Sequence, residues 1–238
     1  LSLREAIGLA NGSIGPDVIR FASNLLGKTT RLTFGELHIV DEVEIEAATL
    51  GGPFTIDSSG NDADPLARPS GDGSRVMTID DGDASSLIDV ELVGLQLVGG
   101  DVLGNGGGIL NAENLTLETS TVAQNAAVAE TPTSDGSVGA GGGIALVEGA
   151  TVTVDRSTVD HNQAEVGAGI AAEDAMVVLH NSTLSANNSA RDGGGVWVRG
   201  AAAALDARHS TIADNFTAGA GGGLFGDQGA TLSLDHTI

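Results

Sequence analysis

The sequence predicts an all-β fold, a right-handed parallel β-helix in which short strands coil around one hydrophobic core. Three observations predict it. A run of three glycines, or a close variant, followed by an aliphatic residue recurs along the second half of the chain. A Ser-Thr-aliphatic segment with an asparagine four residues after the threonine recurs between these runs, and short segments of alternating apolar residues separate the two motifs. Repeats of this length without a helical pattern are typical of β-solenoids.

The spacing of the repeats predicts the size of a coil. The aliphatic residue after each glycine run is expected to face the core, and successive copies are separated by 35, 26, 26 and 28 residues. These core positions are Ile109, Ile144, Ile170, Val196 and Leu224. A stretch over 126–140 that is rich in Pro, Ser, Gly and Ala lengthens the first interval and predicts a loop insertion. Each remaining coil of 26 to 28 residues is predicted to hold three short strands.

The recurring asparagines predict a ladder at one corner of the solenoid. Equivalent residues in stacked coils lie about 4.8 Å apart, which is the spacing of neighbouring strands. An asparagine amide at a turn can bond to the backbone and to the asparagine of the next coil. The predicted structural ladder consists of Asn125, Asn162, Asn187 and Asn215.

One continuous solenoid domain is expected, with two parts that differ in regularity. Residues 101–238 contain the regular repeats, whereas residues 1–100 are predicted to form a cap helix and irregular first coils, with a loop over 58–74. Because Leu1 lies inside a motif and Ile238 inside a repeat, we expect the chain to continue beyond both ends.

The N-terminal segment over 3–10 has the composition of a short helix. Ser2 is its predicted N-cap, since Glu5 follows three residues later and completes a capping box. The open end of a solenoid exposes strand edges and core side chains, which favour aggregation. We therefore expect this helix to cap the solenoid.

Composition and charge exclude several classes of function. The formal net charge is −22 and Lys28 is the only lysine, so we expect no binding to nucleic acid. No apolar run is long enough to span a bilayer, and this segment is not expected to insert into a membrane. The chain has no cysteine, and hence no disulfide framework. No organic cofactor is expected, but calcium is a candidate ligand because aspartates crowd the loops between residues 62 and 83.

The alternation of the first strand in each coil predicts an outward column that contains aromatic residues. The residues that follow the core positions are Leu110, Ala145, Ala171, Trp197 and Phe225. Exposed aromatic side chains can stack on a sugar ring or contact a partner protein. We therefore take Trp197, Phe225 and Leu110 as the candidate binding surface for a glycan or a protein ligand.

A second outward column is predicted to be acidic and to end in histidines. It reads Glu118, Asp155, His180, Asp206 and Asp235, with His209 and His236 just beyond it. Histidine and aspartate are ligands of divalent transition metals. The metal candidates are His180, Asp206, His209, Asp235 and His236. Stacked carboxylates also permit acid and base catalysis of glycoside hydrolysis, although no complete catalytic motif is present.

The whole layout resembles a family of bacterial repeat proteins named for an N-terminal Cys-Ser-Leu-Arg-Glu-Ala motif. The segment from Ser2 to Ile7 reads Ser-Leu-Arg-Glu-Ala-Ile and matches that motif, with Leu1 in the place of the cysteine. The later units are similar to the repeats of polymorphic outer-membrane proteins and of β-helix autotransporter passengers. The resemblance implies export to the extracellular space or the outer cell surface of a bacterium.

Two functions remain open at this stage. The first is a non-catalytic surface module that serves in adhesion, in partner or glycan binding, or as a stalk. The second is a polysaccharide-active enzyme, a lyase or glycoside hydrolase of the pectin-lyase-like β-helix class, since one architecture hosts both kinds of protein. No catalytic residue can be assigned from the resemblance.

Overall fold

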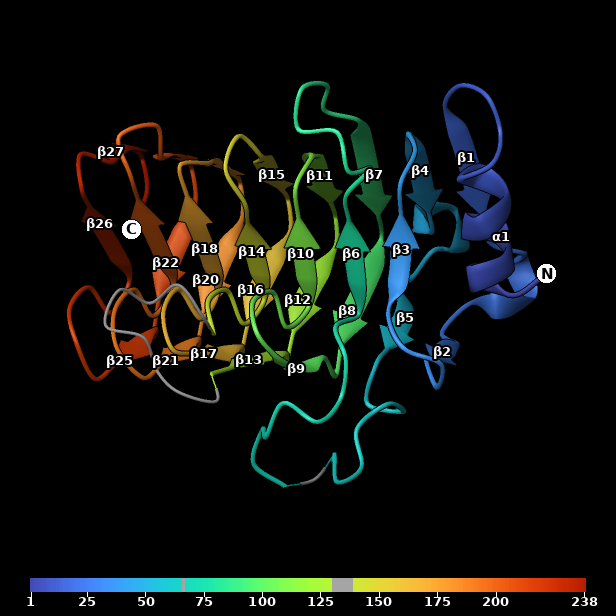
Figure 1. The fold of residues 1–238 in the computed structure, drawn as a ribbon, viewed down its shortest axis with the longest axis horizontal. Coiled ribbons are helices and arrows are strands. Elements are labelled where there is room, and N and C mark those ends of the chain that lie inside the picture. The colour runs from blue at the N-terminus through green and yellow to red at the C-terminus, as the bar shows by residue number, and fades with distance from the viewer. Residues whose placement is uncertain (66, 130–138) are drawn as a thin grey trace.

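The chain folds into a right-handed parallel β-helix that is closed at its N-terminal end by one helix (Figure 1). The computed structural model describes residues 1–65, 67–129 and 139–238. Strands from successive coils stack along the solenoid axis and pair in parallel, so that three sheets run the length of the molecule and a shorter fourth sheet begins at β9 (Asp101–Leu103). Each complete regular coil therefore contributes one strand to each of the four sheets.

The four sheets are named A to D, and their strands follow in the order in which they pair. Sheet A contains β1 (Asp17–Arg20), β4 (Val43–Glu46), β7 (Asp89–Val93), β11 (Asn114–Glu118), β15 (Thr151–Asp155), β19 (Met176–His180), β23 (Ala204–Arg208) and β27 (Thr231–Asp235). Sheet B contains β2 (Thr29–Arg31), β5 (Phe54–Asp57), β8 (Leu95–Val98), β12 (Thr121–Ala123), β16 (Thr158–Asp160), β20 (Thr183–Ser185) and β24 (Thr211–Ala213). Sheet C contains β3 (Leu37–Ile39), β6 (Met77–Ile79), β10 (Ile109–Asn111), β14 (Ile144–Leu146), β18 (Ile170–Glu173), β22 (Val196–Arg199) and β26 (Leu224–Asp227). Sheet D contains β9 (Asp101–Leu103), β13 (Ala126–Val128), β17 (Gln163–Ala164), β21 (Asn188–Ser189) and β25 (Phe216–Thr217).

Sheet D corrects the predicted number of strands in a coil. The sequence predicts three strands, whereas each regular coil has four, in the order C, A, B and D. The strands of sheet D are only two or three residues long, too short to show a period of two. One of them, β13, falls inside the loop predicted over 126–140. Residues 130–138 of that predicted insertion lie outside the described residues.

The core positions predicted from the repeat lie in register on sheet C. Ile109, Ile144, Ile170 and Val196 pair in sequence, and each is fully buried. The corner that precedes these four core residues has room only for glycine. A Cβ atom on Gly143 would lie 2.6 Å from the carbonyl oxygen of Gly169 in the next coil. This close approach of backbones explains why the glycine runs recur with the coil.

Asparagines and serines form two ladders at the corners that flank sheet B. The Asn162 amide nitrogen Nδ2 donates to Asn187 Oδ1 at 3.0 Å and to the Val122 carbonyl at 3.0 Å. Its Oδ1 accepts from the backbone N–H of Asn125 at 3.0 Å. The same contacts join Asn125, Asn162, Asn187 and Asn215. A parallel ladder joins Ser120, Ser157, Ser182 and Ser210 through backbone N–H donors and hydroxyl acceptors. Both ladders supply hydrogen-bond partners to buried backbone groups at the turns.

Helix α1 (Leu3–Ala10) covers the N-terminal end of the core. Ser2 and Glu5 form a capping box, in which the Glu5 carboxylate accepts from the Ser2 backbone N–H at 2.8 Å. The residues that the helix buries against the first coils are Leu3, Ile7 and Ala10. Two short 3₁₀ helices, η1 (Ser23–Leu25) and η2 (Ala48–Leu50), lie between the irregular strands that follow.

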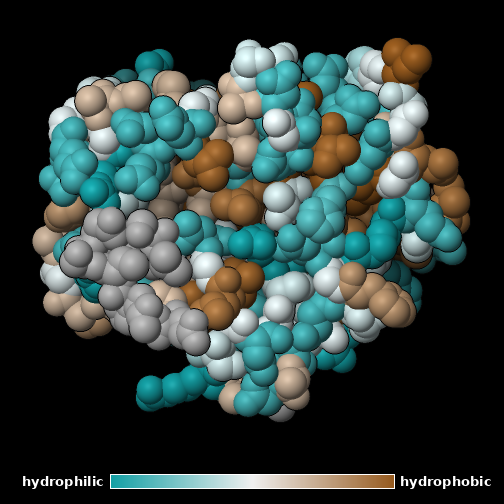
Figure 2. Space-filling model, viewed as in Figure 1, coloured by the Kyte–Doolittle hydropathy of each residue, from teal (hydrophilic) through white to brown (hydrophobic). Residues whose placement is uncertain are grey.

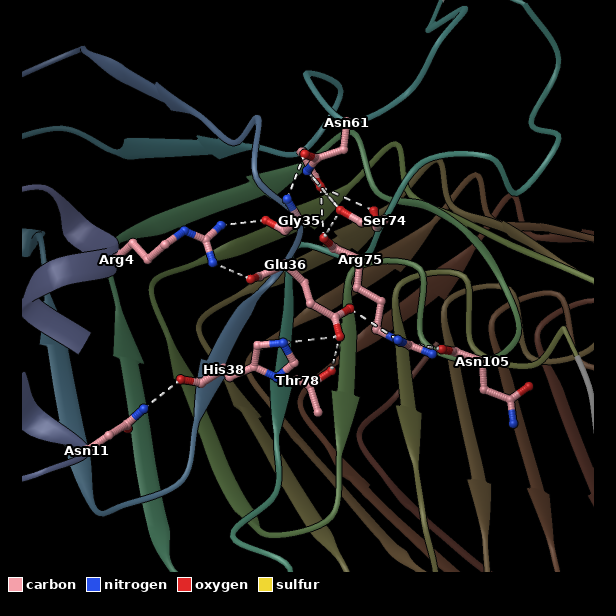
Figure 3. A network of polar contacts seen from close by, with 11 residues as sticks. Arg4, Asn11, Gly35, Glu36, His38, Asn61, Ser74, Arg75, Thr78 and Asn105 are labelled. Atoms are coloured by element: carbon pink, nitrogen blue, oxygen red, sulfur yellow. Dashed lines mark hydrogen bonds and ion pairs between the residues drawn. The ribbon is translucent and has the colours of Figure 1, made fainter. Parts of the chain in front are cut away.

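A polar network fixes this helix to the first coils (Figure 3). The Arg4 guanidinium donates to the carbonyl oxygens of Gly35 at 2.5 Å and Glu36 at 2.6 Å. The Glu36 carboxylate pairs with the Arg75 guanidinium at 3.1 Å and accepts from the Thr78 hydroxyl at 3.2 Å. The network therefore connects the cap helix with the chain that enters both β3 and β6.

Candidate functional site

The predicted aromatic column lies in register but is largely covered. Leu110, Ala145, Ala171, Trp197 and Phe225 pair in that order on the outward face of sheet C. Trp197 is only 4% exposed, and Leu110 and Phe225 are half-buried. The expected exposure of Trp197 is thus wrong.

The cover over Trp197 comes from neighbouring coils. Ala140, Val166 and Ala171 pack with the indole outside the core, and Phe225 packs against this cluster. Figure 2 views the face of sheet C. In the part drawn in colour, hydrophobic residues form small groups separated by hydrophilic ones. A small cavity of about 280 Å³ remains beside Trp197, with Arg199 and Gln228 among its lining residues.

The predicted metal and acid column is in a different register from the one expected. Arg208, not Asp206, pairs with His180 and with Asp235 on sheet A. The two additional residues of this coil lie in the turn between β22 and β23, which shifts Asp206 by two positions. The Asp206 carboxylate instead pairs with the Arg208 guanidinium at 2.8 Å.

The three histidines of this edge lie close together without converging on one point. The ring centroids of His180 and His209 are 6.4 Å apart, and those of His209 and His236 are 5.1 Å apart. Among the described residues, three ligand atoms lie within 4.8 Å of one another in only two groups, and neither group contains a histidine. The carboxylates of this face are engaged as well, since Arg156 pairs with both Glu118 and Asp155.

A larger cavity lies elsewhere, beneath the loop over 58–75. A cavity of about 580 Å³ separates this loop from the corner between sheets B and D. A second cavity of about 450 Å³ continues along sheet D and shares Pro69, Ala126 and Gln163 with the first. The two cavities together are called the loop groove. Its polar lining includes Asp57, Asp62, Arg68, Asp101, Gln124, His161, Gln163, Glu165 and Asn188.

The base of the loop is held closed by buried hydroxyl and amide groups. The Ser58 hydroxyl, which is fully buried, donates to the Arg75 carbonyl at 2.8 Å. Asn61 Nδ2 donates to the Ser74 hydroxyl at 2.8 Å, and Asn61 Oδ1 accepts from the Gly35 N–H at 2.9 Å (Figure 3). The loop therefore leaves and rejoins the solenoid at one point, as compact surface loops do.

The far part of the loop is held by Asp101, the first residue of β9. Its carboxylate accepts from the backbone N–H groups of Ser70 at 2.9 Å and Gly71 at 3.0 Å. Gly71 has a φ of +79°, and a Cβ atom there would lie 2.9 Å from the Leu103 nitrogen. These contacts hold this part of the loop against β9, at the edge of the loop groove.

The electrostatics of Asp101 reflect its position under the loop. Asp101 is 6% exposed, and burial raises the pKa of its carboxyl group. The two backbone N–H donors oppose this shift, whereas the carboxylates of Asp62 and Asp72 add to it. The hydrogen bonds to the loop thus offset part of the effect of burial on the pKa of Asp101.

One outward column of sheet D forms the floor of the loop groove and continues past it. Asp101, Ala126, Gln163, Asn188 and Phe216 pair successively in parallel. Gln163 and Asn188 are exposed, and Phe216 is 63% exposed. The column therefore presents two amides and an aromatic ring on three consecutive coils.

Two groups of acidic residues lie where the candidate calcium ligand could be held. Oxygen atoms of Asp62, Asp64 and Asp72 lie within 4.8 Å of one another, as do those of a second group, Asp80, Asp81 and Glu113. Several of these oxygens already have partners within the loops. For example, Asp62 Oδ1 accepts from the Asp64 N–H at 2.8 Å, and the Glu113 carboxylate accepts from the N–H groups of Asp81 and Ile88. Several of these acidic side chains are thus explained by the hydrogen bonds with which they form turns.

Sequence reasoning missed the loop groove because its roof is an irregular loop and its floor is sheet D, whose strands are too short to show a period. The one available signal is the position after each ladder asparagine, which reads Ala126, Gln163, Asn188 and Phe216. These residues differ in chemistry, and their common outward face becomes evident only with the fourth strand of the coil.

Comparison with known proteins assigns the chain to a class. The architecture is a β-solenoid that carries a ligand-sized groove beneath a surface loop. The chain matches the family described as right handed beta helix region over residues 82–235, more than half of its length, and it belongs to that family. No curated protein and no solved structure matches it. In the part of the chain that the structure describes, no helix has the length and apolarity needed to cross a bilayer.

Proposed function

We propose that this chain is a non-catalytic β-helix module that binds a glycan in the loop groove, at the outer surface of a bacterial cell or in the extracellular space. The observation that carries the proposal is the continuous groove of two joined cavities beneath a surface loop. Its lining of amides, carboxylates and prolines supplies the donors, acceptors and apolar contacts that sugars require.

The direction of the groove suits an extended polymer. Its floor crosses successive strands of sheet D, so equivalent side chains recur about every 4.8 Å along the axis. That interval is close to the length of one sugar residue in an extended chain. Gln163 and Asn188 would then meet consecutive sugars, with hydroxyl groups as hydrogen-bond partners.

Affinity electrophoresis on a panel of neutral, amino and acidic polysaccharides tests this proposal. The native protein should be retarded by at least one of them, and the double substitution Gln163→Ala with Asn188→Ala should reduce that retardation. Thr153→Ala, on the outward face of sheet A, is the matched control and should migrate as the native protein does. If every polysaccharide in the panel leaves the mobility unchanged, the proposal is wrong.

Asp101 supports a second candidate, a polysaccharide-active enzyme. A buried carboxyl group with a raised pKa can serve as a general acid, and Asp57 and Asp62 line the same cavity. Against this, a general acid must be protonated, and a proton on Asp101 would weaken the hydrogen bonds by which both of its oxygens hold the loop. Release of shorter chains from the same panel, abolished by Asp101→Asn, would establish the enzyme; binding without release supports the module.

A further inference from the structure

We infer that the glycan bound in the loop groove is a chain of amino sugars that carries positive charge. The inference rests on the proposed function and adds the chemical class of the ligand. It is based on the charged groups that line the groove, on the exposed column of sheet D, and on the charge of the whole chain.

The charged side chains of the loop groove are predominantly acidic. Asp57, Asp62 and Asp101 line the first cavity, and Glu165 lines the second, where Arg68 is the one basic residue among the described lining residues. Uronic acid or sulfated polymers would place anions against these carboxylates, which costs free energy at short range. An ammonium group on each sugar is attracted instead.

The carboxylates of the groove can accept further hydrogen bonds from such a ligand. Each oxygen of Asp101 accepts one backbone N–H, and Asp57 Oδ1 accepts from the Ser59 N–H at 2.9 Å. A carboxylate oxygen has two lone pairs, so each can accept a further bond from an ammonium group. The same carboxylates can therefore hold the roof and contact the ligand.

The exposed column extends the track beyond the roofed part of the groove. Gln163 and Asn188 offer amide donors and acceptors to sugar hydroxyl groups, and Phe216 follows on the next coil with its ring exposed to solvent. An aromatic ring provides a flat apolar surface for the face of a sugar ring and attracts cations through its quadrupole. Both contacts favour a cationic sugar at this position.

The net charge of −22 also favours a cationic polymer over an anionic one. Long-range attraction raises the association rate of a ligand of opposite charge and falls with added salt. Carboxylates alone would attract any cation, including a basic peptide. The recurrence of amides and an aromatic ring at strand spacing is the feature that selects a sugar chain.

Isothermal titration with oligosaccharides of matched length tests the inference. The probes are β-1,4-linked oligomers of glucosamine, N-acetylglucosamine and glucose, an oligomer of galacturonate, and oligolysine. We expect glucosamine oligomers to bind most tightly and their affinity to fall as salt is raised. Asp62→Asn combined with Glu165→Gln should weaken glucosamine binding about three- to tenfold while leaving the neutral oligomers unchanged.

Phe216→Ala tests the contribution of the exposed column of sheet D to binding, separately from that of the acidic side chains. It should weaken glucosamine binding about three- to tenfold. Phe34→Ala is the matched control, since Phe34 is 88% exposed near the opposite end of the solenoid and should leave binding unchanged. Both rings are exposed, and thermal unfolding of each variant verifies that the fold is retained.

The outcomes separate this inference from the proposed function. Tighter binding of galacturonate or of a neutral oligomer overturns the inference and leaves glycan binding intact. Oligolysine binding as tight as glucosamine binding, or an unaltered affinity in Phe216→Ala, also overturns it. If none of the sugars binds, the proposed function itself is wrong.

Discussion

The asparagine ladder shows how one residue type can stabilise a solenoid corner. Asn162 is fully buried, and its side chain uses both its donor and its acceptor groups on three other residues. A buried polar group that loses its partner costs about 1 to 3 kcal/mol. The ladder is therefore a set of linked contacts, in which removal of one amide takes a hydrogen-bond partner from groups in both adjacent coils.

Asn162→Ala should destabilise the protein by about 3 kcal/mol or more, because the Val122 carbonyl, the Asn125 donors and Asn187 Oδ1 all lose a partner. Urea unfolding monitored by circular dichroism measures the change. Asn114→Ala is the control, since its side chain makes one exposed hydrogen bond to Asp89, and it should cost about 0.5 kcal/mol or less. Equal losses in the two variants would show that the ladder adds no special stability.

Residue identity predicts the ladder and the inward column well, but it predicts exposure poorly. Asn125 and Ile109 could be assigned from spacing because each repeats at a fixed position in the coil. Trp197 was also placed in the correct column. Its burial depends on Val166 and Ala140, which lie in the corner before sheet C and belong to no recognisable pattern. Tertiary cover of this kind cannot be read from alternation.

At the scale of an element, the strands of sheets A, B and C were predictable and those of sheet D were not. β11 and β15 have five residues and alternate clearly, whereas β17 and β21 have two residues and no period. The loop groove was missed for the same reason, because its floor is sheet D. The shift of Asp206 has a different cause, since an insertion can lie in either of two turns that the sequence does not distinguish.

The cap helix gives the Ser-Leu-Arg-Glu-Ala segment a structural explanation. Ser2 and Glu5 close the capping box, Leu3 enters the core, and Arg4 binds two carbonyls of the first coil. Each side chain thus serves either to begin the helix or to hold it on the open end of the solenoid. We therefore expect the segment to act in folding.

Arg4→Ala should lower the free energy of unfolding by about 1 to 2 kcal/mol, because two charge-assisted hydrogen bonds are lost at a partly buried site. Hydrogen exchange should locate the effect in α1 and β3, with little change in the later coils. Arg31→Ala is a suitable control, since the Arg31 guanidinium donates an exposed hydrogen bond of 3.2 Å to the Ser59 carbonyl. Uniform loss of protection along the chain would contradict a local role for the cap.

At the scale of the whole molecule, the acidic charge is distributed over loops and outward faces, and some of it is energetically unfavourable. Burial raises the pKa of Glu91, and the nearby carboxylates of Glu44 and Glu118 raise it further. Burial likewise raises the pKa of Asp101 and of Glu113. Folding therefore opposes ionisation at these three carboxyl groups. Glu5 and Asp83 are opposite cases, since hydrogen bonds from Ser2 and Ser85 lower the pKa of each.

These shifts predict that the protein becomes more stable as the pH is lowered from neutral to about 5. Carboxyl groups of the unfolded chain have pKa values near 4, so above that pH the folded protein, with its raised pKa values, binds more protons than the unfolded chain. The gain in stability from Glu91, Asp101 and Glu113 is complete once the pH is below the pKa that these groups have in the unfolded chain.

In that lower pH range Glu5 and Asp83 also become protonated, and the loss of their favourable hydrogen bonds as carboxylates lowers the stability.

Urea unfolding midpoints across this pH range, at constant ionic strength, measure the effect. Glu91→Gln should reduce the slope, because it removes one of the groups that takes up a proton on folding. Added salt separates the two causes at Glu91: it screens the repulsion from Glu44 and Glu118 but leaves the cost of burial in place. A slope that vanishes entirely in high salt would mean that repulsion alone raises these pKa values. A stability that falls steadily from neutral pH downward would contradict the assigned directions.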